Sequence, residues 1–101
     1  SLHDALPISL FMGVVQPGQK VTKQLVVKSK KPFKVLGVTC DDKSFQFDTS
    51  KDTGAKELHL IPVTFMAGSD AGKVVKTIKI KTDQGETTPE LAAYAVIAAT
   101  R

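Results

Sequence analysis

The side chains that could carry out covalent chemistry in this 101-residue chain are few. Cys40 is the only cysteine, and the two histidines are His3 and His59. Nucleophilic catalysis needs a nucleophile, a base that takes its proton and a group that orients the base. No catalytic motif flanks Cys40 or His59. His59 stands between two leucines, where we expect it to face solvent or to be a hydrogen-bonded residue of a sheet. The sequence therefore predicts no catalytic residue and no enzyme.

The same inventory is poor in metal ligands. One histidine and one cysteine cannot supply a tetrahedral zinc site. Asp41 and Asp42, together with Asp48 or Asp52, could approach a calcium ion, but the spacing of a calcium-binding loop is missing. Turn formation is the simpler explanation for these aspartates. We therefore predict no metal site, and we expect Cys40 to be a small buried apolar side chain.

The segment 68–73, Gly-Ser-Asp-Ala-Gly-Lys, is superficially similar to a phosphate-binding loop. It has three residues between its glycines where that motif has four, and Val74 stands where a magnesium-binding Ser or Thr is needed. It also leads into an apparent strand, whereas phosphate loops lead into a helix. We expect a flexible loop between strands and no bound cofactor.

Basic residues give the chain a net charge of +4, and all of them except Arg101 are lysines. Arginine is the usual residue for bidentate phosphate and base-edge contacts, whereas lysine is a hydrated point charge. Basic and aromatic residues are not interleaved, so we expect no nucleic-acid partner.

The lysines form two groups, one around a turn and one along a strand that also carries Lys73 and Lys76. Two interpretations are open. The lysines either make a solvated surface with protected sheet edges, or form a shallow contact for acidic polysaccharide, lipid headgroups or an acidic protein. The candidate contact residues are Lys28, Lys30, Lys31, Lys34, Lys79 and Lys81.

Alternating apolar residues and turn residues at short intervals predict an all-β, immunoglobulin-like sandwich of about seven strands. A chain of this length has room for one core, and no stretch approaches the roughly 18 apolar residues of a membrane span. We expect strands at 10–15, 21–28, 33–40, 45–47, 58–65 and 73–82. We expect the core to contain Leu25, Val27, Val35, Phe45, Phe47, Leu60, Phe65, Ile78, Ile80 and Tyr94.

Two segments conflict with simple alternation. Leu58 and Leu60 are followed by apolar residues of the opposite parity, which predicts a bulge at Ile61-Pro62 and an edge or bulge position for Pro62. Thr88-Pro89-Glu90 followed by an alanine-rich stretch is typical of a helix start, although a closing strand fits the same residues. Local sequence slightly favours the helix.

Phe11-Met12-Gly13-Val14-Val15-Gln16-Pro17-Gly18, followed by Val21-Thr22-Lys23-Gln24-Leu25-Val26-Val27, resembles the opening of Hydin-type immunoglobulin-like domains. The later pieces at 31–36, 38–42 and 58–65 are similar to an uncharacterised bacterial branch of that group. Met12 is an insertion into the usual Phe-Gly pair. The resemblance implies a seven-stranded sandwich related to major sperm protein and pilus chaperones. It also implies a final strand over 90–99, in place of the helix.

The DNA sequence TCC CTA CAC GAC GCT CTT CCG ATC, the end of a common sequencing adapter, encodes the peptide Ser-Leu-His-Asp-Ala-Leu-Pro-Ile, which is residues 1–8. We therefore expect residues 1–8 to be foreign and 9–101 to be a single domain, the C-terminal part of a longer protein. The resemblance implies an exported module of the bacterial periplasm or cell envelope, with protein partners. The alternatives are an accessory domain of an upstream enzyme and a lysine-based binder of anionic ligands.

Overall fold

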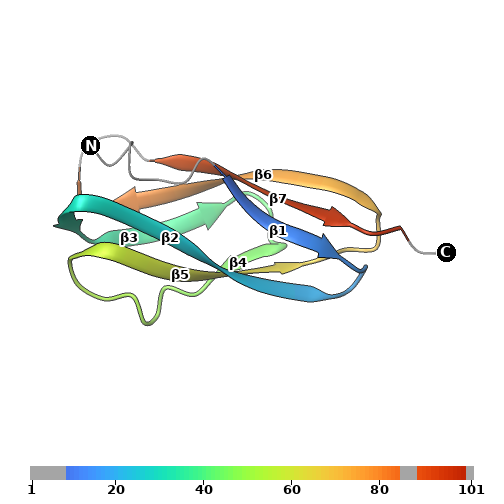
Figure 1. Ribbon diagram of the computed structural model, residues 1–101, viewed down its shortest axis with the longest axis horizontal. Helices are drawn as coiled ribbons and strands as arrows, with labels where there is room; N and C mark the ends of the chain where they lie inside the picture. Colours follow the sequence, from blue (N-terminus) through green and yellow to red (C-terminus); the bar gives the residue numbers. More distant parts are fainter. Residues whose placement is uncertain (1–8, 85–88, 100–101) are drawn as a thin grey trace.

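The computed structural model describes residues 9–84 and 89–99, which form seven strands in two sheets (Figure 1). The predicted all-β sandwich is confirmed. The strands are β1 (Ser9–Val15), β2 (Lys20–Phe33), β3 (Val35–Cys40), β4 (Phe45–Phe47), β5 (Lys56–Met66), β6 (Gly72–Thr82) and β7 (Glu90–Ile97). The adapter-like residues 1–8, with His3, and the arginine at the C-terminus lie outside the described residues.

The two sheets have the strand orders β1-β7-β6-β3 and β2-β5-β4. Strands β2, β5 and β4 thus face strands β3, β6 and β7, as in immunoglobulin-like sandwiches. β1 joins the larger sheet by pairing parallel to β7, so that the first and last strands of the domain lie side by side. Within the described ranges there is no helix long and apolar enough to cross a membrane.

The residue inserted into β1 is accommodated by a bulge. Phe11 pairs with Tyr94 and Val14 with Val96, so Met12 and Gly13 together lie opposite a single residue of β7. Gly13 has a φ of +97°, a conformation that residues with a side chain rarely adopt. The bulge turns the Met12 side chain into the core, where it is buried.

The segment 90–99 forms a strand through Ile97 and not the helix that its local sequence favours. Leu91, Ala93, Ala95 and Ile97 are buried, with half-buried residues between them. β7 lies between β1 and β6, so both of its edges make ladder hydrogen bonds. This pairing outweighs the helical preference of alanine, because propensity is a weak prior against tertiary packing.

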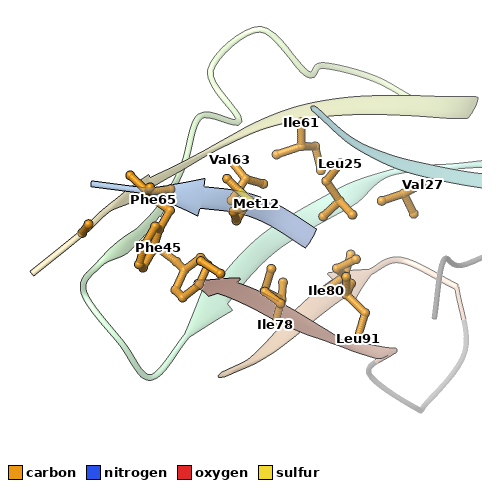
Figure 2. Close-up of a cluster of buried hydrophobic side chains, with 14 of the residues drawn as sticks. Met12, Leu25, Val27, Phe45, Ile61, Val63, Phe65, Ile78, Ile80 and Leu91 are labelled. Atoms are coloured by element: carbon orange, nitrogen blue, oxygen red, sulfur yellow. The ribbon is translucent and has the colours of Figure 1, made fainter. Parts of the chain in front are cut away.

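The core lies between the two sheets and receives side chains from both (Figure 2). Most of the expected core residues are confirmed. Those found buried are Leu25, Val27, Phe45, Phe65, Ile78 and Ile80, whereas Val35 and Phe47 are half-buried and pack against the core. Tyr94 alternates with the buried Ala93 and Ala95, so it lies on the outer face of the sheet and its assignment to the core is wrong. Leu60 is 45% exposed, so its assignment to the core is wrong.

The error at Leu60 comes from the parity of β5. His59, Ile61, Val63 and Phe65 are the buried residues, and the register against β2 runs without a shift from Lys20 opposite Met66 to Lys28 opposite Leu58. The predicted bulge at Ile61-Pro62 is therefore wrong.

Pro62 lies in the central strand of its sheet, but β4 ends opposite Val63. The carbonyl of Pro62 accepts the Asp48 backbone N–H at 3.0 Å, on the side of β5 where β4 has already ended. Because the nitrogen of a strand residue points to the same side as its carbonyl, Pro62 removes no hydrogen bond from the β2–β5 ladder.

Candidate functional site

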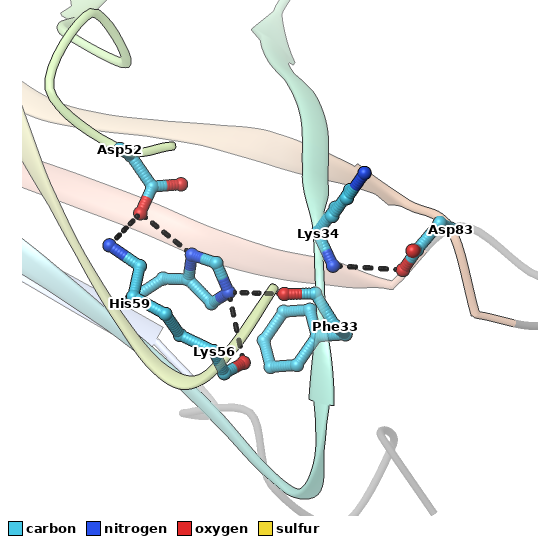
Figure 3. A network of polar contacts seen from close by, with 6 residues as sticks. All are labelled: Phe33, Lys34, Asp52, Lys56, His59 and Asp83. Atoms are coloured by element: carbon cyan, nitrogen blue, oxygen red, sulfur yellow. Dashed lines mark hydrogen bonds and ion pairs between the residues drawn. The ribbon is translucent and has the colours of Figure 1, made fainter. Parts of the chain in front are cut away.

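His59 is completely buried and lies at the centre of a network of polar contacts (Figure 3). Its Nδ1 lies 2.7 Å from Asp52 Oδ1, and its Nε2 lies 2.6 Å from the Phe33 carbonyl oxygen and 3.1 Å from that of Lys56. The Phe33 ring packs against the imidazole, with centroids 4.4 Å apart. Of the two alternatives for His59, the solvent-facing one is wrong, and the hydrogen-bonded residue of the sheet is correct.

The partners of His59 are side-chain and backbone oxygens on both sides of the ring. An ionised carboxylate and two carbonyls offer only acceptor atoms, so a ring that satisfies both sides donates from both nitrogens. The Asp52 side chain is only 3% exposed, and its Oδ1 also lies 3.3 Å from the Lys56 ammonium. These hydrogen bonds explain how the polar His59 ring is tolerated at a buried position.

The His59–Asp52 pair holds the loop at 48–55 against the start of β5. Beside this loop, on the outer face of the smaller sheet, lies a hollow of about 370 Å³. The hollow is lined by Gln24, Asp48, Lys51, Asp52, Lys56, Leu58, Leu60 and Pro62. Val26, which pairs with Leu60 across the β2–β5 ladder, is also exposed. We call this region the β2–β5 hollow.

Sequence reasoning missed this hollow because it assigned Leu60 to the core. His59, Ile61, Val63 and Phe65 alternate along the strand, and this pattern would have placed all four in the core if His59 had been counted as an inward residue. Leu58 and Leu60 then fall on the outer face by parity.

The aspartates proposed to form turns do so at two positions. Asp42 accepts the backbone N–H of Ser44 at 2.8 Å, and Asp48 accepts both the backbone N–H and the hydroxyl of Ser50. These hydrogen bonds lower the pKa of both carboxyl groups, through the Ser44 backbone at Asp42 and chiefly through the Ser50 hydroxyl at Asp48. Asp52 has the different role described above, as the side-chain hydrogen-bond partner of His59.

Cys40 lies in β3, where it pairs with Ile78 of the neighbouring strand β6 in the same sheet, and is half-buried. Its nearest polar partner is Asp41 Oδ1, 3.9 Å from the sulfur, and His59 makes its hydrogen bonds elsewhere. Burial raises the pKa of the Cys40 thiol, which disfavours the reactive thiolate. The structure therefore does not bring Cys40 and His59 together as a nucleophile and its base.

The candidate lysines fall in two separate places. Lys28, Lys30 and Lys31 lie in β2, where four residues from Ser29 to Pro32 stand opposite one residue of β5. Lys34 follows directly, with its backbone N–H donating to the Asp83 carboxylate at 2.8 Å (Figure 3). Lys79 and Lys81 lie in β6 of the other sheet, so the two groups do not form one site.

Only one of the two lysine groups lies on an edge strand. β6 is paired on both sides, by β7 and β3, so Lys79 and Lys81 protect no edge. β2 is the edge strand of its sheet, and it carries Lys20, Lys23 and Lys28. Lys23 shares the face of Leu25 and Val27, and a charge on the inner side of an edge strand discourages pairing with another sheet.

Metal-ligating side chains are dispersed in the part of the chain that the structure describes. No three of its His, Cys, Asp and Glu side chains lie close enough to hold a metal ion. The loop at 68–71 connects β5 to β6, and Lys73 already belongs to that strand, as expected for a connection between strands.

No protein-family model and no curated protein matches the chain. Among solved structures, it is similar to a family 123 glycoside hydrolase from Clostridium perfringens, whose structure concerns glycolipid glycan hydrolysis. The TM-score is 0.66 over 89% of this chain, at 8% sequence identity, and the chain spans 22% of the hydrolase chain. At this identity the likeness shows the sandwich fold alone.

Proposed function

We propose that this domain is a non-catalytic interaction module of a larger, exported bacterial protein, and that it binds a protein partner through the β2–β5 hollow. The observation that carries the proposal is the hollow itself, in which two exposed leucines and Pro62 form an apolar floor. Binding sites are commonly concave and apolar with a few polar groups at the rim.

The walls of the hollow suit a site that changes little on binding. Asp52 and Lys56 line it and are fixed by the buried network around His59. Gln24 and Lys51 supply polar groups at the rim. A fixed wall reduces the entropy that is lost when a partner binds. We expect the partner to insert an apolar side chain over Leu58 and Leu60.

The environments of His59 and Cys40 support the non-catalytic part of the proposal. The ring nitrogens of His59 already have hydrogen-bond partners, and the thiol of Cys40 is disfavoured as a nucleophile by its raised pKa. Export and attachment to a longer chain rest on the resemblance to Hydin-type domains.

Site-specific photo-crosslinking tests this function. Long-read sequencing across the codon for Ser9 recovers the longer gene, and benzoylphenylalanine then replaces Leu60 in its full product. We expect a discrete crosslink to a protein segment, inside or outside the same polypeptide. The same probe at exposed Thr39, in the other sheet, serves as the control. Equal crosslinking from both positions, or none from position 60, would refute the proposal.

The runner-up function is an accessory domain of an enzyme. The observation in its favour is that a similar sandwich forms part of a glycoside hydrolase chain. A catalytic domain in the recovered gene, with the crosslink from position 60 falling on it, would favour this function. A gene containing only further sandwich domains would argue against it.

A further inference from the structure

The outer face of the larger sheet combines an apolar half with a basic half. Phe11 pairs with Tyr94 and Val14 with Val96, while Val75 of β6 pairs with Tyr94 from the other side. Val14 is 68% exposed and Val75 is 53% exposed, and Phe11 is also exposed. Three neighbouring strands thus place apolar side chains side by side on one surface.

Along β6, the same face continues as a basic surface. Alternate residues of a strand point to the same side, so Val75 shares its face with Lys73, Thr77, Lys79 and Lys81. Their neighbours Ile78 and Ile80 are buried, which confirms that these lysines point outward. Thr39 of β3 lies opposite Lys79 and extends the polar half.

Beyond the proposed function, we propose that this face docks on an anionic lipid surface. The apolar half enters the interface between headgroups and acyl chains, and Lys73, Lys79 and Lys81 contact the phosphates. Lysine suits this role because it is a point charge that needs no fixed partner geometry. Lysines close to an anionic membrane add their attractions, and apolar contact strengthens the binding.

The position of Lys73 favours a lipid surface over a protein partner at this face. Its ammonium lies 5.5 Å from the centre of the Tyr94 ring, which itself stacks on Phe11 with centroids 4.9 Å apart. A protein covering Tyr94 would bury this ammonium and would need a matching carboxylate. In a lipid interface the lysine stem follows the apolar surface while its charge stays among the headgroups, where aromatic residues also collect.

A second copy of the chain is a poorer occupant. A symmetric dimer places the same patch on both sides, so the lysines of one copy would meet those of the other. Among the described residues, Glu90, opposite Lys79, is the only acidic residue that pairs with the outward residues of β6. The β2–β5 hollow lies on the other sheet, so lipid and protein contacts do not compete.

Vesicle co-sedimentation of the whole chain tests the proposal. The probes are vesicles of phosphatidylcholine alone and vesicles that also contain phosphatidylglycerol. We expect binding to the anionic vesicles only, weakened by salt. Lys79→Gln with Lys81→Gln should weaken it about thirtyfold, since each lysine near the surface contributes roughly a factor of five. Val14→Ser with Val75→Ser should weaken it roughly tenfold.

Matched controls separate this face from general basic charge. Lys30→Gln with Lys31→Gln removes the same charge from β2 and should leave most of the binding intact. Val26→Ser with Leu60→Ser alters the β2–β5 hollow and should leave vesicle binding unchanged, even where it abolishes the protein contact. Thermal unfolding shows that each variant is folded. No binding to anionic vesicles, equal binding to neutral ones, or an equal loss with Lys30→Gln and Lys31→Gln would overturn the proposal.

Discussion

Asp52 and His59 form a buried hydrogen-bonded pair, with 2.7 Å between Asp52 Oδ1 and His59 Nδ1. The pair connects the loop after β4 to β5. Through His59 Nε2 it also satisfies the Phe33 carbonyl, at the point where β2 leaves its sheet. One side chain therefore joins the loop and β5 to the end of β2, 26 residues away in sequence, and the β2–β5 hollow depends on the position of the loop.

Removing the carboxylate should strongly destabilise the fold. Asp52→Ala removes the only side-chain hydrogen-bond partner that the buried His59 ring has among the described residues, and a buried polar group left without its partner costs about 1–3 kcal/mol. Urea unfolding followed by circular dichroism measures the loss. Asp48→Ala in the same loop, where the carboxylate is exposed, should cause a much smaller change. Equal effects of the two substitutions would contradict the importance of the pair.

The ring of His59 should donate hydrogen bonds from both of its nitrogens. Both of its nitrogens face acceptors in the folded chain, so each should bear a hydrogen. Nitrogen-15 chemical shifts, measured through long-range proton couplings, distinguish a cationic ring from either neutral tautomer. A nitrogen with the shift of a free lone pair would show that Asp52 holds the proton.

The corrected parity of β5 makes a prediction about two leucines. Leu25→Ala should cost about 2–5 kcal/mol, because the side chain is fully buried. Leu60→Ala should change the free energy of unfolding by less than about 1 kcal/mol, since Leu60 lies on the outer face. Chemical denaturation of both variants checks this contrast. Similar losses would restore Leu60 to the core.

Acid should weaken the fold through Asp42 and Asp48. Both have a native pKa below the ordinary value of 3.8, because serine donors stabilise the charged form. The unfolded chain therefore binds more protons as the pH falls, so this contribution is complete above the ordinary pKa and disappears below it. Unfolding free energies between neutral pH and about pH 3 should fall less steeply for Asp42→Asn than for the unmodified chain. An unchanged slope would contradict this assignment.

Cys40 should react slowly with alkylating reagents at neutral pH. Burial raises the pKa of its thiol above the ordinary value of 9.0, so the thiolate is scarcer than in a free cysteine. Rates of iodoacetamide modification against pH, compared with a cysteine-containing peptide, should show a midpoint displaced to higher pH. A reaction faster than that of the peptide at neutral pH would indicate an activated thiol.

Local sequence sufficed where structure depends on neighbouring residues. The turn at Gln16–Gln19 follows from Pro17-Gly18: Gln19 N–H donates to the Gln16 carbonyl at 3.1 Å, and Gly18 has a φ of +79°. The alternation in β6 also correctly predicted that Ile78 and Ile80 point inward and that Lys79 and Lys81 point outward. In the turn at 16–19, neighbouring residues favour one turn type. In β6, neighbouring residues determine which face of the strand points toward the core.

Tertiary structure decided the rest, because the responsible partners lie far apart in sequence. β7 is a strand since β1 and β6 pair with its two edges, although its alanines favour a helix. His59 turns inward because Asp52 and the Phe33 carbonyl, 26 residues away, satisfy its ring. The pairing of the first strand with the last also brings Phe11 to Tyr94 and creates the apolar half of the outer face. Sequence alone thus determined a seven-stranded sandwich without a recognisable catalytic motif. The candidate surfaces required the strand pairing, since side chains converge only once the sheets have formed.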